Sequence, residues 1–298
     1  MGKDKYLLRI AIDGPDGVGK THTANLAYLE TARYCESVKK TKYAFDLHAV
    51  RWPSKEFRQT DRWKQVPEKL AKGVTLDDIK SWAYAMLEDN YITLKELLRK
   101  SKTNMACVIE DRGVLSTFTY QFAMYCRGKG YKHDPTKNLP PDLVTEYESW
   151  CEWVASTYNA GFESLGLQAH MQGSIYVLLD RLEEALTAGD AKRNATETDK
   201  AFEEMAPLIW DLFTKQSFRI REYESPDYGG GSHKIWSLDQ KIPRLTGFGR
   251  EVHPVFQGKC IDLYAKKPLG KEEADFNSLR TVSTILDNIV GWDKNFSG

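Results

Sequence analysis

The chain lacks the features that mark several protein classes. Its five cysteines form no C-x-x-C pair, so neither a zinc site nor a redox motif is indicated, and their odd number suits a reducing compartment. Basic and acidic residues balance at 42 each, which argues against a large non-specific nucleic-acid surface but leaves room for a local basic patch. No apolar run is long enough for a membrane span, and the first expected strand leaves no room for a signal peptide. We therefore expect a soluble cytoplasmic protein with no membrane partner, in the host cytoplasm if the source is viral.

A specific motif stands near the N-terminus. The pattern G-x-x-x-x-G-K-[ST] of a phosphate-binding loop is matched by Gly14, Pro15, Asp16, Gly17, Val18, Gly19, Lys20 and Thr21. Residues 7–12 before it predict a strand and residues 21–34 behind it a helix, which is the context that the motif requires. Glycines let backbone N–H groups surround phosphate oxygens, and the helix N-terminus adds partial positive charge. We expect bound nucleoside triphosphate, with Lys20 reaching its β- and γ-phosphates and Thr21 holding Mg²⁺.

Strand-like and helix-like segments alternate along the rest of the chain. Helices are expected over 75–100, 142–165, 183–186, 202–213 and 272–290, and strands over 43–50, 105–109, 175–179 and 260–264. Residues 225–258, rich in glycine, proline and charge, predict a long loop or a β-hairpin. This alternation predicts one α/β domain spanning the chain, a doubly wound parallel sheet with helices on both faces.

A second motif follows the strand expected at 105–109. Its end, Asp111-Arg112, lies where ligands bind in open α/β sheets. The segment resembles the D-R-x-x-x-S-x-x-x-Y-Q signature of thymidylate kinases, carried here by Asp111, Arg112, Ser116, Tyr120 and Gln121. Residues 51–53 resemble that family's arginine–aromatic–proline segment, and 176–193 resemble its fourth strand, next helix and basic lid. The resemblance covers roughly residues 5–121 and 174–214, with an ending at 259–290.

The resemblance implies a P-loop kinase that uses ATP and Mg²⁺ on a nucleotide substrate. Lys20, Asp111, Arg112 and Asp16 would be the catalytic residues, with Asp16 near the sugar 3′-hydroxyl and Asp111 supporting the Mg²⁺ held by Thr21. Gly17 replaces the arginine that some members carry in the loop, so compensating charge is expected from Arg193 in a lid of about 187–200. The acceptor would be bound by Arg51, Asn90, Arg112, Ser116, Tyr120 and Gln121.

The chain also departs from the family pattern. Met86 and Asn90 stand where members carry an aromatic that stacks on thymine and an arginine for the acceptor phosphate. Asn90 can still hydrogen-bond a base edge or a hydroxyl, and Asn90→Arg is predicted to improve monophosphate acceptance. Two insertions are expected, at about 122–173 and 215–258, the first beside the acceptor pocket.

Several functions therefore stay open. The first is transfer of the ATP γ-phosphate to a thymidine-type acceptor, dTMP to dTDP. The alternative resembles the phage 5-hydroxymethyluracil DNA kinases, which modify DNA by phosphorylating the base hydroxymethyl group; an alcohol acceptor needs a general base, for which Asp111 or Asp16 is available. DNA would then be a partner, its backbone tracked by Arg58, Arg62, Lys64, Lys69 and Lys72. Another nucleoside acceptor, a non-enzymatic nucleotide-binding module and a homodimer remain further alternatives.

Overall fold

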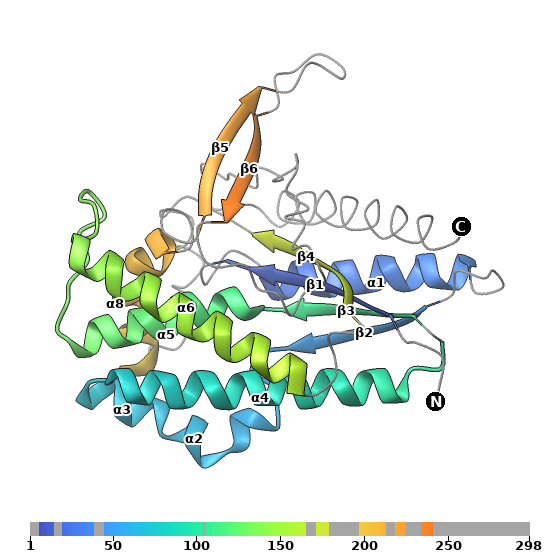
Figure 1. The fold of residues 1–298 in the computed structure, drawn as a ribbon, viewed down its shortest axis with the longest axis horizontal. Helices are drawn as coiled ribbons and strands as arrows, with labels where there is room; N and C mark the ends of the chain where they lie inside the picture. Colours follow the sequence, from blue (N-terminus) through green and yellow to red (C-terminus); the bar gives the residue numbers. More distant parts are fainter. Residues whose placement is uncertain are drawn as a thin grey trace.

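A parallel sheet forms the centre of the protein (Figure 1). The computed structural model describes residues 6–14, 20–38, 45–103, 105–164, 171–178, 197–212, 218–224 and 234–240. The strands are β1 (Tyr6–Asp13), β2 (Asp46–Arg51), β3 (Met105–Asp111) and β4 (Met171–Leu178), in the order β2-β3-β1-β4. β1 therefore lies between β3 and β4, and the connections β1 to β2 and β3 to β4 run in opposite directions along the sheet, which is the arrangement that opens a ligand crevice at the carboxyl ends of the strands.

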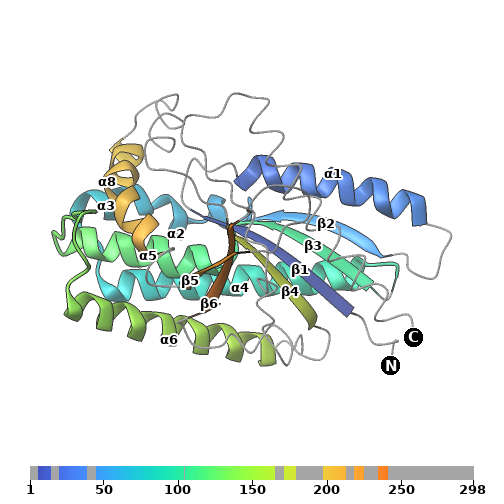
Figure 2. The same ribbon diagram turned by 90° about the horizontal axis from the view of Figure 1, so that it is seen from above.

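Helices cover both faces of this sheet (Figure 2). α1 (Lys20–Val38) lies on one face, while α4 (Leu76–Lys100), α5 (Val114–Gly128) and α6 (Pro141–Ser164) lie on the other. The two central strands β1 and β3 are buried on both faces, which explains why most of their residues are apolar, whereas the edge strand β2 is half-buried to exposed. The predicted fold class, a parallel α/β sheet covered on both faces, is confirmed.

The longest described helix, α4, has the start and the buried stripe that its sequence predicts. The Thr75 hydroxyl accepts from the backbone N–H of Asp78 while the Asp78 carboxylate accepts from the backbone N–H of Thr75, a capping box. Residues three and four apart face the sheet and α5, and the buried residues of α4 are Ile79, Trp82, Ala83, Ala85, Leu87, Asn90, Tyr91, Leu94 and Leu98. Asn90 is the one polar member of this buried stripe, so it lies on the face that α4 turns toward the core.

Shorter elements complete the described structure. Between β2 and α4 lie η1 (Phe57–Gln59), α2 (Asp61–Lys64) and α3 (Val66–Lys72), and α8 (Glu197–Asp211) packs against α3 and α5. β5 (Phe218–Glu224) and β6 (Lys234–Gln240) pair antiparallel as a separate two-stranded sheet, so the expected hairpin exists but begins before residue 225. In the described helices we find none that is both long and apolar enough to cross a membrane.

The start of α8 differs from the prediction, and several other predicted elements fall outside the described residues. α8 begins at Glu197, about one turn before the helix start expected at residue 202, and so includes the end of the lid expected over 187–200. Its buried stripe consists of Ala201, Met205, Leu208 and Ile209. The remainder of that lid, the helix expected at 183–186, the strand expected at 260–264 and the helix expected at 272–290 lie outside the described residues.

Candidate functional site

The ends of β1 and β3 lie side by side at the carboxyl edge of the sheet. Ile12 pairs with Asp111 in the parallel register, and the backbone N–H of Arg112 donates to the Ile12 carbonyl at 3.0 Å. Lys20 opens α1 close to this edge, and its Nζ donates to the Gly14 carbonyl at 2.8 Å. The intervening residues Pro15, Asp16, Gly17, Val18 and Gly19 lie outside the described part of the chain, so their predicted roles stay predictions.

The first and second motifs meet through one hydrogen bond. Thr21 Oγ1 donates to Asp111 Oδ2 at 2.7 Å, although the two residues are 90 positions apart. Arg51 Nε lies 3.4 Å from the same carboxylate oxygen. The other oxygen, Asp111 Oδ1, is buried without a hydrogen-bond partner among the described residues. A buried carboxylate oxygen in need of a partner beside a threonine hydroxyl fits Mg²⁺, a hard cation that prefers oxygen ligands and retains several waters.

The backbone turns sharply after Asp111. The backbone φ angle of Arg112 is 77°, in the left-handed region that few residues other than glycine adopt. This conformation directs its guanidinium over the Tyr120 ring, with Cζ 5.0 Å from the ring centroid. Strained backbone of this kind clusters at functional sites, where the surrounding structure must hold it in place. Arg112 is thus fixed by its own backbone and by a cation–π contact.

Asp13 holds this turn, and sequence analysis missed it. Its Oδ1 accepts from the Gly113 backbone N–H at 2.8 Å and from the Ser116 hydroxyl at 2.6 Å, which ties the start of α5 to the end of β1. A Cβ at Gly113 would lie 2.6 Å from Asp13 Oδ2, so the close approach requires glycine. Burial raises the pKa of Asp13, against the hydrogen bonds from Ser116 and Gly113 and the charge of Lys20. A carboxylate directly before the loop glycine is the signal that could have found it.

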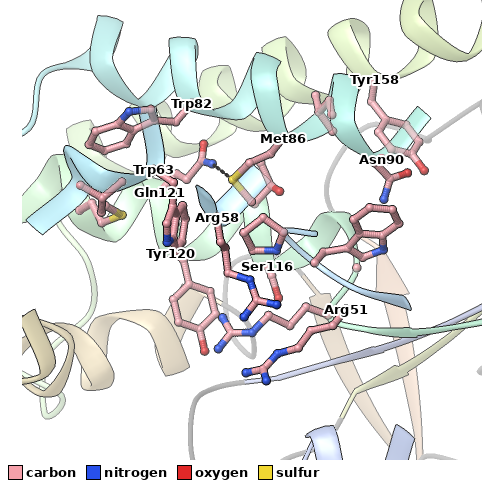
Figure 3. Close-up of a pocket in the computed structure, with 18 of the residues that line it drawn as sticks. Arg51, Arg58, Trp63, Trp82, Met86, Asn90, Ser116, Tyr120, Gln121 and Tyr158 are labelled. Carbon is pink, nitrogen blue, oxygen red and sulfur yellow. Dashed lines mark hydrogen bonds between the residues drawn. The ribbon is translucent and has the colours of Figure 1, made fainter. Parts of the chain in front are cut away.

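A cavity of about 270 Å³ opens beside the sheet edge, between β2, α4, α5 and α6 (Figure 3). Arg51, Arg58, Ser116 and Tyr120 gather toward one side of it, and Trp82, Met86, Asn90 and Tyr158 line the other. Three of the eight tryptophans contribute, since Trp52 and Trp63 join Trp82 in its wall. The cavity therefore pairs a cationic mouth with an aromatic and apolar interior, a combination that suits a flat ring carrying a negative charge.

One amide in the wall has hydrogen-bonding capacity left over. Gln121 Nε2 donates to Met86 Sδ at 3.0 Å, a weak acceptor. Its Oε1 is buried with no partner among the described residues. Because an unsatisfied buried oxygen is costly, the amide is poised for a polar atom of a ligand.

All six predicted acceptor-binding residues line this cavity: Arg51, Asn90, Arg112, Ser116, Tyr120 and Gln121. Arg193 lies outside the described residues, as does Asp16. Sequence analysis overlooked Arg58, Trp63, Trp82 and Phe202 as lining residues. The density of tryptophan and arginine over residues 51–63 was the available signal, since such side chains are enriched in binding sites.

Comparison with known proteins adds little. No protein-family model matches the chain, and no curated protein matches it. Among solved structures, the chain is similar to a thymidylate kinase from Candida albicans, at 13% identity and a TM-score of 0.35, over 71% of this chain and 79% of that one. The class of the protein thus rests on its own features, a parallel α/β sheet with a phosphate-loop motif at its carboxyl edge and an aromatic cavity beside it.

Proposed function

We propose that the protein is an ATP- and Mg²⁺-dependent phosphotransferase that resembles thymidylate kinase and moves the γ-phosphate to a thymidine-type acceptor. Phosphoryl transfer asks little covalent chemistry of a protein; it needs two substrates in line and the developing charge neutralised. The arrangement at the sheet edge supplies both requirements, with a triphosphate side at α1 and an acceptor side in the cavity.

The triphosphate side consists of the loop motif, Lys20 and Thr21. Lys20 is held at the N-terminus of α1 by its bond to Gly14, where the helix dipole also favours anions. Thr21 and Asp111 would hold Mg²⁺, which supplies charge neutralisation on the phosphate oxygens when it is bound. Lys20 would place a fixed positive charge beside the β- and γ-phosphates, where negative charge develops during transfer.

The acceptor side consists of the cavity and the arginines at its mouth. Arg51 and Arg112 present guanidinium forks that suit phosphate oxygens, and the ring of a base would fit among Trp52, Trp63, Trp82 and Met86. A volume near 270 Å³ lies just below the usual range for ligand pockets, so the cavity suits a small ligand such as the base of one nucleotide.

One observation carries this proposal. The Asp111 carboxylate contacts Thr21 at 2.7 Å and Arg51 at 3.4 Å, so a single side chain links the triphosphate side with the acceptor cavity. In an ordinary nucleotide-binding module, nothing would require the carboxylate beside Thr21 to contact an arginine that lines a second, aromatic pocket. The adjacency instead matches the need to bring a donor phosphate and an acceptor oxygen together.

A second candidate is a kinase of 5-hydroxymethyluracil in DNA. It is favoured by Met86 and Asn90 in place of the stacking aromatic and the phosphate-binding arginine, and by Arg58 and Trp63 at the outer wall of the cavity. An alcohol must lose a proton as it attacks, and Asp111 with its unpartnered Oδ1 would accept it. A monophosphate acceptor needs no such base.

A radiolabel transfer experiment distinguishes the two candidates. The protein is given ATP labelled in the γ-phosphate, Mg²⁺, and either dTMP or duplex DNA containing 5-hydroxymethyluracil, with unmodified duplex as control. Label in dTMP supports the first function, and label in the modified duplex alone supports the second. Transfer to neither acceptor, with ATP bound, would remove both candidates.

A further inference from the structure

An arginine stands in the middle of the apolar sheet. Arg9 lies on β1 between Leu8 and Ile10, and the parallel register places it on the same face as Val108 of β3, the face that α4 and α6 cover. Its side chain is 1% exposed. Glu110, two residues beyond Val108 and therefore on the same face, is fully buried. A complete ion pair is thus enclosed between the sheet and the helices.

The guanidinium of Arg9 distributes its donors among three groups. Nε and Nη2 both donate to Glu110, the latter to Oε2 at 2.8 Å. Nη1 donates to the Tyr158 hydroxyl of α6. Nη2 also donates to Asn90 Oδ1 of α4 at 3.4 Å. Arg9 itself does not line the cavity, but Asn90 and Tyr158 do.

Glu110 extends the same network to a third wall residue. Its Oε2 accepts from Trp52 Nε1 at 3.1 Å. Trp52 follows the end of β2, Asn90 lies on α4 and Tyr158 lies on α6, and all three border the cavity. The buried pair therefore connects to the cavity wall at three points, and every connection is a directional hydrogen bond.

A buried ion pair needs a reason beyond stability. Removing two charges from water costs several kcal/mol per ion, and apolar replacements of similar volume are often neutral or stabilising. The best-attested role of such a pair is structural specificity, which means that it stabilises one arrangement of the surrounding side chains over the alternatives. At Arg9 the arrangement selected is that of the side chains in the cavity wall.

The hydrogen bond from Arg9 constrains the orientation of the Asn90 side-chain amide. A guanidinium has only donors, so the Asn90 oxygen must face Arg9 and the Asn90 nitrogen must face elsewhere. In Figure 3 Asn90 projects from α4 toward the side of the cavity on which Arg51 lies. No described residue accepts a hydrogen bond from Asn90 Nδ2, although Asn90 is only 7% exposed. The amide thus offers two N–H bonds to whatever occupies the cavity.

We propose that Arg9 is a positioning residue: from beneath the cavity, it fixes the Asn90 amide as a hydrogen-bond donor toward the ligand. The site then selects a ligand that carries an acceptor oxygen beside Asn90. The proposal rests on the proposed function for the identity of the ligand, a pyrimidine nucleotide. The oxygen belongs either to the ring, where a 4-oxo group accepts and a 4-amino group donates, or to the phosphate. A donor left facing another donor is heavily penalised in a desolvated site.

Calorimetric binding without ATP tests this selection apart from turnover. The probes are dTMP, dCMP, which carries the 4-amino group, and thymidine, which lacks the phosphate. Asn90→Ala is expected to weaken dTMP binding about tenfold, the equivalent of one hydrogen bond. It should also reduce the preference for dTMP over dCMP if the ring oxygen is read, or over thymidine if the phosphate is read. A change in neither preference overturns the proposal.

The role of Arg9 is tested by coupling. Arg9→Lys keeps Glu110 paired, but its compact ammonium cannot serve Glu110, Tyr158 and Asn90 in one plane. In that background, Asn90→Ala is expected to weaken dTMP binding by less than about threefold, because the amide is no longer held. Equal losses in both backgrounds overturn the role of Arg9. The double variant Arg9→Met with Glu110→Met removes both charges at once and should give the same reduced coupling if Arg9→Lys does not fold.

Two further measurements remove ambiguity. Asn138→Ala alters an exposed loop asparagine and should leave every probe affinity unchanged. In ligand-free protein, the side-chain amide resonances of Asn90, identified by their loss in Asn90→Ala, should shift in Arg9→Lys; unchanged resonances overturn the contact. This readout needs no ligand, so it stands even if the transfer experiment finds no acceptor, in which case the proposed function fails while Arg9 still fixes Asn90.

Discussion

The phosphate end of the site and the acceptor cavity are built by opposite means. At the phosphate end, the functional side chains lie at or just after the ends of two strands. Lys20, Thr21 and Asp111 belong to short sequence motifs and contact one another or the neighbouring backbone. The cavity is assembled from the end of β2 and from six helices, α2 to α6 and α8, with the buried pair Arg9–Glu110 beneath it. Short motifs at the ends of the paired strands β1 and β3 build the first region, whereas packing between many elements builds the second.

This difference predicts how each region responds to change. At the phosphate end a conservative substitution should remove chemistry and leave the fold intact, since the side chains reach outward from the sheet edge. In the cavity a substitution should alter stability and ligand choice together, because the same side chains pack and bind. The following substitutions test that contrast, beginning with the largest expected effect.

Asp111→Asn should lower phosphoryl transfer by about 10²–10³-fold, because it removes the anionic charge expected to hold the metal while keeping the shape and an acceptor for Thr21. The rate is measured as label transfer at saturating ATP, and thermal unfolding is measured alongside it. Asp77→Asn, at an exposed position of α4, is the matched control. Full activity in Asp111→Asn would remove this carboxylate from the site.

Asn90→Arg separates the sequence-based expectation from the structural one. The family pattern predicts better monophosphate acceptance, but the structure places Arg9 Nη2 3.4 Å from Asn90 Oδ1, so a second buried guanidinium would meet the first. We expect the free energy of unfolding to fall by about 3 kcal/mol in urea denaturation. Adding Arg9→Met should restore most of that loss and allow the new arginine to pair with Glu110. Asn138→Arg is the control, and an Asn90→Arg single variant of normal stability would contradict the buried network.

Gly113→Ala tests the joint between the two regions. The added methyl would lie 2.6 Å from Asp13 Oδ2 and 2.7 Å from Ala11 Cβ, so we expect a loss of about 1–3 kcal/mol in unfolding free energy. Gly130→Ala has no atom within 4 Å of its Cβ but a φ of 76°, so it reports backbone strain alone, about 1–2 kcal/mol. A Gly113→Ala variant more stable than Gly130→Ala would show that α5 does not approach β1 this closely.

Asp13 should give the smallest effect, seen in the pH dependence of stability. Its pKa is raised in the folded state by burial, so the folded protein binds its proton more tightly than the unfolded chain does. Stability therefore falls as pH rises from the unfolded value of 3.8 through the folded value. Asp13→Asn keeps an acceptor for Gly113 and Ser116, so relative to the native protein it should gain stability toward neutral pH and lose that gain near pH 4. Parallel unfolding profiles of the two proteins across this range would contradict the raised pKa.

Much of the fold could be predicted from sequence because its signals are local. The apolar runs of β1 and β3, the Thr75 cap and the buried stripe of α4 each depend on neighbouring residues. The six predicted acceptor residues that line the cavity were located by the resemblance of residues 51–53 and 111–121 to thymidylate kinases and by the departure from that pattern at Asn90. Arg9 could not be interpreted in this way, because a charge inside an apolar strand gains meaning only from Glu110, Asn90 and Tyr158, which lie 81 to 149 residues away.

Asp13 and Trp82 were missed for a related reason. A carboxylate before a loop glycine has many uses, and only the approach of Gly113 and Ser116 shows that this one holds α5. Trp82 has the spacing of a core residue and is 7% exposed, so no pattern along α4 separates packing from lining a cavity. The shape of a cavity between several elements cannot be predicted from the hydrophobic periodicity of any one of them.

The central claim is that Lys20 and the neighbouring cavity together transfer phosphate from ATP. Label transfer from γ-labelled ATP to dTMP and to DNA containing 5-hydroxymethyluracil tests it most directly when native protein, Lys20→Ala and Lys95→Ala are compared at equal folded concentration. Lys95 is an exposed lysine of α4 and serves as the matched control. We predict Mg²⁺-dependent label in one acceptor for the native protein and Lys95→Ala, and none for Lys20→Ala. Equal transfer by Lys20→Ala, or no transfer by the native protein to either acceptor, would contradict the claim.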